Sequence, residues 1–386
     1  MNSQPSRHHE EILIVDDTPA NLRLLSQMLT SQGYSVRAVT SGARALESVR
    51  ASVPSLILLD IRMPDMDGYE VCNELKDNER TCDIPVIFIS ALNEIEDKVK
   101  AFKLGGVDYI TKPFQLEEVL ARTETHLALR NLQKQLLDAI DKFERELQMA
   151  GKLQASFLPR KLPVLPDWEF AAKLLPASET SGDFYDVFQF PDGRLGIFVA
   201  DVVDKGVEAA MFMALCWGLF RTYMADYPEE LQLSFWEVNQ RLVMDTGGDK
   251  FVTVFYGVVD PQDGQLTYCN AGQSPGLLVK AQDSESVIRL EQTGPPLGII
   301  ENQTWERRVE KIDPGDMLVL YTDGITDAQN GDGNFFDTGG LLEVLLSNSG
   351  RTALEVQEDI LNGVSEFVAD VQQFDDIALF VVMRRG

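Results

Sequence analysis

The stretch LILLDIRMPDMDGYE, residues Leu56–Glu70, predicts the fold of the N-terminal third of the chain. It opens with consecutive aliphatic residues, a pattern typical of a short strand that is buried on both faces. Asp60 follows the aliphatic run directly, and an acidic turn then leads into an amphipathic segment at Gly68–Lys76. A buried strand that is followed shortly by a helix is the repeating unit of a parallel α/β sheet.

The same alternation extends on both sides of this stretch, from Glu11 to about Thr123. A helical pattern at Ala20–Thr30 separates the first two apolar runs. The four further runs are Ile12–Val15, Ser35–Val39, Val86–Ile89 and Asp108–Ile110. Short βα alternation of this kind predicts a doubly wound α/β domain with five parallel strands over residues 11–123.

Polar residues follow four of these five runs. Asp16 and Asp17 follow the first, Asp60 the third, Ser90 the fourth and Lys112 the fifth. The carboxyl ends of parallel strands meet at one edge of a sheet, so we expect these side chains to lie together. Three crowded carboxylates repel one another unless a cation compensates, and Mg²⁺ prefers such oxygen ligands. With the charge neutralised, Asp60 could attack a phosphoryl group whose oxygens Lys112 and Ser90 contact.

Four stretches make this region resemble the receiver domain of two-component response regulators: ILIVDDTPAN, LILLDIRMPDMDGYE, VIFISA and GGVDYITKPF. The resemblance implies that Asp60 accepts a phosphoryl group from a sensor histidine kinase. It implies a Mg²⁺ site formed by Asp16, Asp17, Asp60 and the backbone carbonyl of Arg62. It further implies the switch residues Ser90, Tyr109 and Lys112, and a cis peptide before Pro113.

A long helical pattern without proline follows, over about Gln115–Phe157. Its apolar stripe consists of Leu129, Leu132, Leu136, Ala139, Phe143, Leu147 and Ala150. Steps of three and four residues are typical of a coiled coil, and we favour a dimerising helical linker over residues 124–158. The alternative is a helix that packs on its own domains. The three prolines of Pro159–Pro166 then indicate a domain boundary.

The remaining residues, 168–386, mix strand and helix patterns and predict an α+β domain. The predicted strands are Phe170–Leu175, Arg194–Val203, Phe251–Val259, Gly264–Asn270, Asp316–Tyr321 and Asp376–Arg384. The segment Val207–Tyr223 is apolar nearly all round, which predicts a buried helix. We expect both of its methionines, Met211 and Met213, to lie in the core.

Four acidic patches mark this second region: SGDFYD, VADVVDKG, YTDGITD and FDDIALF. Each touches a predicted strand end or a turn between a strand and a helix. A single Asp-Gly is ordinarily a turn. Four patches in a region without catalytic His, Cys or Lys motifs favour a cluster of oxygen ligands around metal ions. Two divalent ions could lower the pKa of a water molecule and clamp a phosphoryl group, so that no protein nucleophile is required.

This region resembles the PPM-type metal-dependent phosphatases, in particular their sporulation and stress-response branch, which regulates partner-switching sigma-factor pathways. The stretches that carry the resemblance are LQASFLP, SGDFYDVF, ADVVDKGVEAAMFMA, FVTVFYGVVD, YCNAGQSP, GPPLGI, PGDMLVLYTDGITDA and DDIALFVV. The resemblance implies an α-β-β-α sandwich that binds two Mn²⁺ or Mg²⁺ ions. It implies catalytic ligands at Asp183, Asp201, Asp323 and Asp375, with the carbonyl of Val202 as a further ligand and Asp376 as the alternative to Asp375.

Three residues depart from the pattern of that family: Ser181, Gln273 and Ala378. None of them removes a proposed ligand. Gly206 indicates a tight turn into a helix N-terminus, which favours phosphate binding. Lys205 beside it either adds positive charge near the substrate or is simply solvated.

Composition excludes several other classes of function. The formal net charge of -27 leaves no basic surface for nucleic acid, and acidic membranes are disfavoured for the same reason. The only histidines, His8, His9 and His126, disfavour zinc sites and Ser-His-Asp catalysis. Four cysteines without a CxxC pair indicate a reducing, cytoplasmic location. The first apolar run, Ile12–Val15, is too short for a signal peptide, and no stretch is long enough to span a membrane.

These patterns together predict a response regulator whose phosphorylation at Asp60 controls a phosphatase for phosphoserine or phosphothreonine proteins. The resemblance implies a phosphorylated anti-sigma-factor antagonist of the STAS type as the substrate. The alternative is a non-catalytic adaptor that uses the phosphatase fold to bind a sigma factor or an anti-sigma factor. Retention of all four carboxylate positions favours the enzyme.

Overall fold

A computed structural model describes residues 10–91, 95–227, 230–281, 286–347 and 351–385. The chain forms two compact units, and the division between them falls between Lys142 and Phe143, inside the predicted linker. The units are described separately below. Within the described ranges, no helix combines the length and the apolar character that a membrane span requires.

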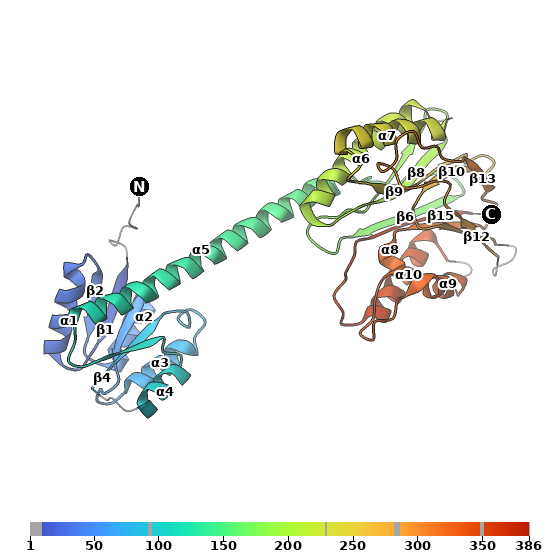
Figure 1. Ribbon diagram of the computed structural model, residues 1–386. Helices are drawn as coiled ribbons and strands as arrows, with labels where there is room; N and C mark the ends of the chain where they lie inside the picture. The colour runs from blue at the N-terminus through green and yellow to red at the C-terminus, as the bar shows by residue number, and fades with distance from the viewer. Residues whose placement is uncertain (1–9, 92–94, 228–229, 282–285, 348–350, 386) are drawn as a thin grey trace. The chain divides into compact units, whose positions relative to one another are not determined.

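The first unit contains a five-stranded parallel sheet with the order β2-β1-β3-β4-β5 (Figure 1). The strands are β1 (Glu11–Val15), β2 (Ser35–Val39), β3 (Leu56–Asp60), β4 (Val86–Ser90) and β5 (Asp108–Thr111). The helices are α1 (Pro19–Ser31), α2 (Gly42–Ala51), α3 (Gly68–Lys76), α4 (Ile95–Lys103) and the start of α5 (Leu116–Ala155). All five predicted apolar runs form strands, so the predicted parallel five-stranded domain is confirmed.

Two apolar layers cover the two faces of this sheet. Successive strand residues point to opposite faces, so Ile12 packs with α1 and α5 whereas Leu13 packs with α2, α3 and α4. The three inner strands are buried almost throughout. This two-sided burial explains why their sequences are continuous apolar runs, and it shows that the domain is doubly wound as predicted.

The helix α5 is a single helix of 40 residues, as the long proline-free pattern predicts. Its first turns belong to the sheet-covering layer, where Thr123 and Leu127 are buried. From Leu129 to Phe143 the predicted stripe is exposed, with exposed fractions of 51% at Leu129 and 62% at both Leu132 and Leu136, whereas Leu147 and Ala150 are partly buried. The stripe side chains from Leu129 to Phe143 are therefore open to solvent in this structure, and their pairing with a second helix stays a prediction.

The second unit is a sandwich of two five-stranded sheets, with orders β13-β10-β9-β8-β7 and β12-β11-β14-β15-β6. Its first strands are β6 (Trp168–Leu175), β7 (Phe184–Gln189), β8 (Leu195–Val202), β9 (Val252–Val259) and β10 (Gln265–Ala271). The later strands are β11 (Gly276–Val279), β12 (Val287–Leu290), β13 (Arg308–Lys311), β14 (Met317–Tyr321) and β15 (Ile377–Arg384). The helices are α6 (Gly206–Asp226), α7 (Leu231–Thr246), α8 (Asp323–Thr326), α9 (Asp337–Leu346) and α10 (Ala353–Val368).

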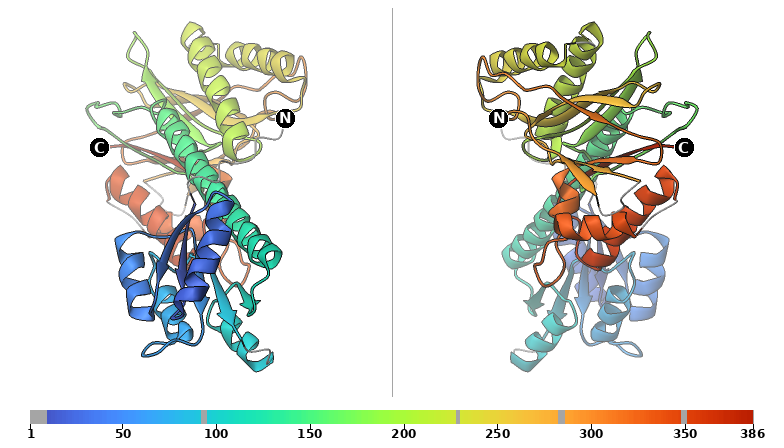
Figure 2. Two further views of the ribbon diagram at one scale, coloured as in Figure 1. Left: turned by 90° about the vertical axis from the view of Figure 1, so that its left-hand side faces the viewer. Right: turned by 90° about the vertical axis from the view of Figure 1, so that its right-hand side faces the viewer.

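Three apolar layers hold this sandwich together. One lies between α6–α7 and the first sheet, one between the two sheets, and one between the second sheet and α8–α10. Figures 1 and 2 show the two helical layers on opposite sides of the paired sheets. Alternation along β8 sends Phe198 into the first layer and Val199 into the second. The predicted α-β-β-α architecture is confirmed.

One packing prediction in this unit is half wrong. Met213 lies fully buried in the layer beneath α6, as predicted, but Met211 is 71% exposed. Helix α6 lies at the surface of the sandwich and buries one face, so an apolar residue on its outer face is not a core residue.

Candidate phosphoacceptor site and candidate metal centre

The carboxyl ends of β1 and β3 bring three aspartates together in the first unit. Carboxylate oxygens of Asp16, Asp17 and Asp60 all lie within 4.8 Å of one another. The Lys112 ammonium, just after β5, donates to Asp60 at 2.7 Å and to Asp16 at 2.9 Å. The sequence prediction that these four side chains meet at one edge of the sheet agrees with the structure.

Burial raises the pKa of Asp60, and the neighbouring Asp16 adds to this effect, while Lys112 opposes it. Asp16 is held in place by the backbone amide of Thr18 at 2.8 Å and by the Asn21 amide at 3.0 Å. Asp16 and Asp60 are buried and Asp17 is exposed, and the cluster of three carboxylates and one ammonium retains negative charge. Its oxygen donors fit a hard divalent cation such as Mg²⁺.

The remaining receiver residues lie nearby or on the adjoining surface. Ser90 is buried at the end of β4, and the backbone amide of Arg62 hydrogen-bonds Asp60. Tyr109 lies on β5, where its hydroxyl accepts a hydrogen bond from Lys98 at 3.0 Å. The peptide bond between Lys112 and Pro113 is cis, as expected.

In the second unit, Asp201 near the end of β8 lies at the centre of an acidic cluster. Burial, then the negative charge of Asp323, raises the pKa of Asp201 to about 7, and Asp375 and Asp376 contribute. Asp183, directly before β7, is buried, and its pKa is raised well above the usual range by burial and by Asp201. The structure therefore brings Asp183 and Asp201 together at one end of the first sheet.

Asp323 and Asp375 reach the same cluster from the second sheet. Asp323 begins α8 directly after β14, and Asp375 precedes β15. Desolvation and then the charge of Asp375 raise the pKa of Asp323, although part of its side chain contacts solvent. A Cβ atom on Gly324 would lie only 1.8 Å from the Asp376 carbonyl oxygen. Because Gly324 has no side chain, α8 can approach the acidic pair this closely.

Asp376 has a different environment from Asp375. Its two carboxylate oxygens accept hydrogen bonds from the backbone amides of Ala177 and Gly182, each at 2.7 Å. The Asp375 carboxylate instead accepts from the Lys205 ammonium at 3.0 Å. Asp376 thus fixes the loop that leads to Asp183, which favours Asp375 over Asp376 as the ligand of the pair.

Two further aspartates of the acidic patches lie outside this cluster. Asp186 is buried and accepts hydrogen bonds from Arg221 at 2.6 Å and from the Trp217 indole at 3.1 Å. Asp204, in the turn before α6, pairs with Lys250. Both are engaged with cations, so the sequence patches contain structural aspartates as well as candidate ligands.

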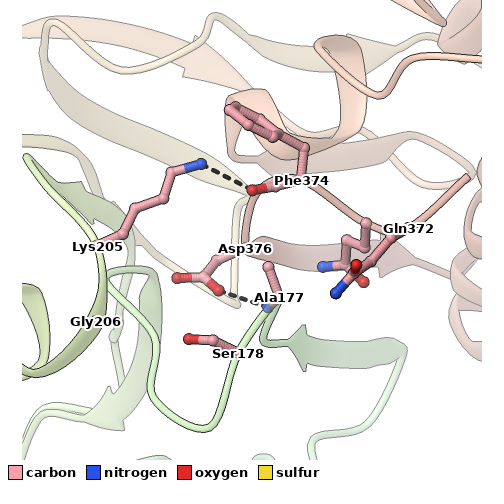
Figure 3. A pocket seen from close by; sticks show the side chains of 8 residues that line it. Ala177, Ser178, Lys205, Gly206, Gln372, Phe374 and Asp376 are labelled. Atoms are coloured by element: carbon pink, nitrogen blue, oxygen red, sulfur yellow. Dashed lines mark hydrogen bonds between the residues drawn. The ribbon is translucent and has the colours of Figure 1, made fainter. Parts of the chain in front are cut away.

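Lys205 lines a cavity of about 380 Å³ beside the acidic pair (Figure 3). Its ammonium lies 3.8 Å from the centre of the Phe374 ring and donates to the Phe374 carbonyl at 2.8 Å. Ser178 and Gly206 line the same cavity. Lys205 is therefore half-exposed and paired with Asp375 rather than simply solvated, and its role as positive charge near a substrate stays a prediction.

The three departures from the family pattern have defined places. The Ser181 hydroxyl accepts from the Asp183 amide at 3.0 Å, so it stabilises the turn before that aspartate. Gln273 is buried and donates a hydrogen bond to the Tyr321 carbonyl at 3.3 Å. It accepts a hydrogen bond from the hydroxyl of Thr253, the residue of β9 that pairs with Asp201. Ala378 pairs through its backbone with Thr322. None of these residues displaces a carboxylate of the cluster.

Two residues of this site were not predicted from the sequence. The Thr322 hydroxyl donates to the Asp183 carboxylate at 2.5 Å and ties the end of β14 to that aspartate. Gln154, near the end of α5, is buried and pairs through its side-chain amide with the backbone of Ser181, accepting from its amide at 2.9 Å. Gln154 lies within the LQASFLP stretch, but no local pattern indicates its distant partner.

The end of α5 also touches the loop before Asp183 through its backbone. A Cβ atom on Gly151 would lie 2.0 Å from the Glu179 carbonyl oxygen. Phe157, just after the helix, stacks on Trp217 of α6 with ring centres 5.0 Å apart. The observed helix ends two residues before the predicted end at Phe157, because α5 stops at Ala155 and a turn follows.

The donors of the second cluster are carboxylates with the carbonyl of Val202 nearby. That carbonyl oxygen lies 3.2 Å from where a Cβ atom of Gly182 would stand, so it faces the segment of Asp183. These hard oxygen donors fit Mn²⁺ or Mg²⁺. Across the described ranges, three acidic groups with mutual distances under 4.8 Å occur only at Asp16, Asp17 and Asp60. The second cluster is wider, with Asp375 drawn toward Lys205.

A parallel receiver-type unit followed by a two-sheet sandwich with an acidic centre defines a receiver-linked protein of the PP2C phosphatase fold. Residues 191–385 match the family described as Stage II sporulation protein E (SpoIIE), and residues 12–124 match the response regulator receiver domain. The chain therefore belongs to the SpoIIE family and carries a receiver domain on its N-terminal side.

Three known proteins illustrate the similarity. The chain is 32% identical to Protein IcfG of Synechocystis sp. over 322 residues, which are 74% of this chain but only half of IcfG. It is 26% identical to Phosphoserine phosphatase RsbU of Bacillus subtilis over 265 residues, covering 68% of this chain and 75% of RsbU. The SiaA-PP2C domain of Pseudomonas aeruginosa has the same fold, with a TM-score of 0.57, 21% identity, and coverage of 64% of this chain and 99% of that domain.

Proposed function

We propose that this protein is a metal-dependent phosphatase for phosphoserine or phosphothreonine proteins, controlled by phosphorylation of its receiver domain. The observation that carries the proposal is the environment of Asp201. Its pKa is raised to about 7 by burial and by the carboxylates of Asp323, Asp375 and Asp376, next to Asp183. Such like-charged, desolvated groups require a compensating cation, and perturbed carboxylates of this kind cluster at functional sites.

The proposed catalytic ligands are Asp183, Asp201, Asp323 and Asp375, with the carbonyl of Val202. Bound Mn²⁺ or Mg²⁺ would supply a water of lowered pKa and charge compensation for the phosphoryl oxygens. Within the protein, the Thr322 hydroxyl holds Asp183, and the backbone amides of Ala177 and Gly182 hold Asp376. The Lys205 ammonium places positive charge at the rim, where a phosphate group would enter.

The receiver domain gives this activity an input. We propose Asp60 as the phosphoacceptor, a sensor histidine kinase as the phosphodonor and Mg²⁺ held by Asp16, Asp17, Asp60 and the carbonyl of Arg62. Ser90, Tyr109 and Lys112 would respond to the modification. The similarity to Phosphoserine phosphatase RsbU supports a phosphoserine substrate. We further propose that this substrate is a phosphorylated anti-sigma-factor antagonist and that the protein acts in the cytoplasm. Retention of the carboxylates argues against the non-catalytic adaptor.

The proposal is tested by assaying the purified full-length chain on p-nitrophenyl phosphate and on a phosphoserine protein. We expect turnover with Mn²⁺ or Mg²⁺, none in excess chelator, and a change in rate when beryllofluoride is added to mimic phosphorylated Asp60. Binding of a sigma or anti-sigma factor without any turnover would support the adaptor instead.

The exposed stripe of α5 is the proposed route from the receiver to the phosphatase. The helix is continuous, and its middle is exposed at Leu132 and Leu136. Near its end, the Gln154 side chain is hydrogen-bonded to the backbone of the loop before Asp183. A change of a few kcal/mol in the preferred dimer geometry would be sufficient to shift the active population.

Replacing Leu132 and Leu136 with serine should therefore weaken dimerisation and make the phosphatase rate independent of beryllofluoride. Both side chains are 62% exposed, so the monomer should remain folded. Sedimentation velocity and phosphatase assays measure the two effects, with serine at the exposed Leu24 of α1 as the control. A wild-type chain that is monomeric in both receiver states, yet still regulated, would contradict the dimer mechanism.

A further inference from the structure

An apolar groove of about 340 Å³ lies beside the candidate metal centre, within the second unit. It runs between the residues just after α8, the C-terminal half of α10 and the segment that precedes β15. Its aliphatic lining residues include Leu361, Val364, Val368, Val371 and Ile377. The groove therefore offers an apolar surface within the domain that carries the acidic cluster.

The groove is continuous with the acidic cluster. Asp375, a candidate ligand, and Gly324, next to the candidate ligand Asp323, both line it. Phe374 lines the groove and also the separate cavity that contains Lys205, and its side chain is 82% exposed. The segment 372–374 lines both hollows, so a positively charged surface and an apolar surface both adjoin the acidic pair.

The chemistry of the groove restricts its occupant. Asp327 and Asp375 at its edge repel acidic side chains, and the whole chain carries a formal charge of -27. Aromatic side chains, phenylalanine included, are enriched in the buried cores of protein interfaces, and Phe374 is exposed at this groove. An extended chain advances by roughly 3.3–3.6 Å per residue, so the groove is within reach of positions next to a phosphoserine at the cluster.

We propose that this groove binds an apolar side chain of the protein substrate, close in sequence to the phosphorylated serine or threonine. The inference rests on the proposed phosphatase function and adds a rule for substrate choice. The phosphoryl group lies at the carboxylate cluster, and the neighbouring apolar residue packs against Val368, Val371 and Phe374. Phosphoproteins with only acidic or amide side chains around the modified residue are then poor substrates.

The test compares p-nitrophenyl phosphate with phosphoserine peptides that carry either leucine or asparagine at each position flanking the phosphoserine. With the full-length protein and Mn²⁺, one leucine peptide should have a kcat/KM at least about tenfold above its asparagine counterpart, as apolar pockets typically discriminate. Val371→Asp should remove this preference by raising KM, and it should leave turnover of p-nitrophenyl phosphate unchanged. Val371 is 41% exposed and can accept a polar side chain without loss of the fold.

Leu354→Asp is the matched control, since Leu354 is 56% exposed in the first turn of α10 and does not line the groove. This variant should keep the leucine preference. Equal cleavage of all peptides by the unaltered protein, or a preference that survives in Val371→Asp, would overturn the proposal. A faster rate on p-nitrophenyl phosphate in Val371→Asp would also overturn it, because a segment of this chain would then occupy the groove.

A failure of the proposed phosphatase function can be distinguished from a failure of the groove proposal. If p-nitrophenyl phosphate is not hydrolysed with Mn²⁺, the fluorescence anisotropy of labelled phosphopeptides still measures binding to the groove. Tighter binding of the leucine peptide than of the asparagine peptide, lost in Val371→Asp and kept in Leu354→Asp, would support the groove without catalysis. Equal binding of both peptides would reject it.

Discussion

Replacing Asp201 with asparagine should lower metal-dependent turnover of p-nitrophenyl phosphate by about a hundredfold or more. Loss of residues that only support metal ligands typically costs about 10–100-fold, and Asp201 is proposed to contact both ions. The amide removes the negative charge at the centre of the cluster, where Asp183, Asp323 and Asp375 surround it. Steady-state rates at saturating Mn²⁺ measure the effect.

The same variant should unfold at a temperature no lower than that of the wild type, because it relieves repulsion between buried carboxylates. Thermal unfolding without metal checks this expectation and separates lost chemistry from lost folding. Asp332→Asn, in an exposed loop, is the control and should leave turnover unchanged. Wild-type rates in Asp201→Asn, or turnover by the wild type in excess chelator, would refute the two-metal mechanism.

Replacing Asp60 with asparagine should reduce phosphorylation by acetyl phosphate to background. In the wild type, the label should depend on Mg²⁺ and should be released by hydroxylamine, as expected for an acyl phosphate. The reason is geometric. The carboxylate oxygens of Asp60, Asp16 and Asp17 lie within 4.8 Å of one another, and the Asp60 carboxylate lies 2.7 Å from the Lys112 ammonium. Asparagine has no carboxylate with which to form the acyl phosphate.

Asp65→Asn provides the control for this experiment. Asp65 is exposed in the turn after β3 and has a φ of 71°, a conformation that asparagine also tolerates. It should be phosphorylated like the wild type. An Asp60→Asn chain that incorporates label at the wild-type rate would show that another residue is the phosphoacceptor.

Much of the fold follows from local sequence patterns. The inner strands of the receiver sheet are buried on both faces, and their sequences are therefore continuous apolar runs that can be recognised as strands. Strand β7 was not predicted, because Phe184–Gln189 contains the charged Asp186, which is buried only through its pairing with Arg221 and Trp217. The strands β11, β12 and β13 have four residues each, and β12 and β13 lie at sheet edges with few buried residues, so their sequences show no apolar pattern distinct from a loop.

The acidic residues of the candidate centre could be predicted because they lie in four acidic patches, three of which adjoin or overlap a predicted strand. Their supporting contacts could not, since they join distant positions. Thr322 and Asp183 are 139 residues apart, and Gln154 and Ser181 are 27 residues apart. The different environments of Asp375 and Asp376 likewise depend on Lys205 and on two backbone amides, none of which a sequence pattern connects to them.

The uninterrupted course of α5 ties the length of the linker to its rotational phase. An α-helix turns by about 100° per residue, so one inserted residue would rotate Gln154 by that angle about the helix axis relative to Leu127. Seven inserted residues would restore the phase to within about 20°. Because Gly151 and Gln154 contact the loop before Asp183, we expect changes in the length of α5 to preserve the proposed coupling mainly in steps of whole heptads.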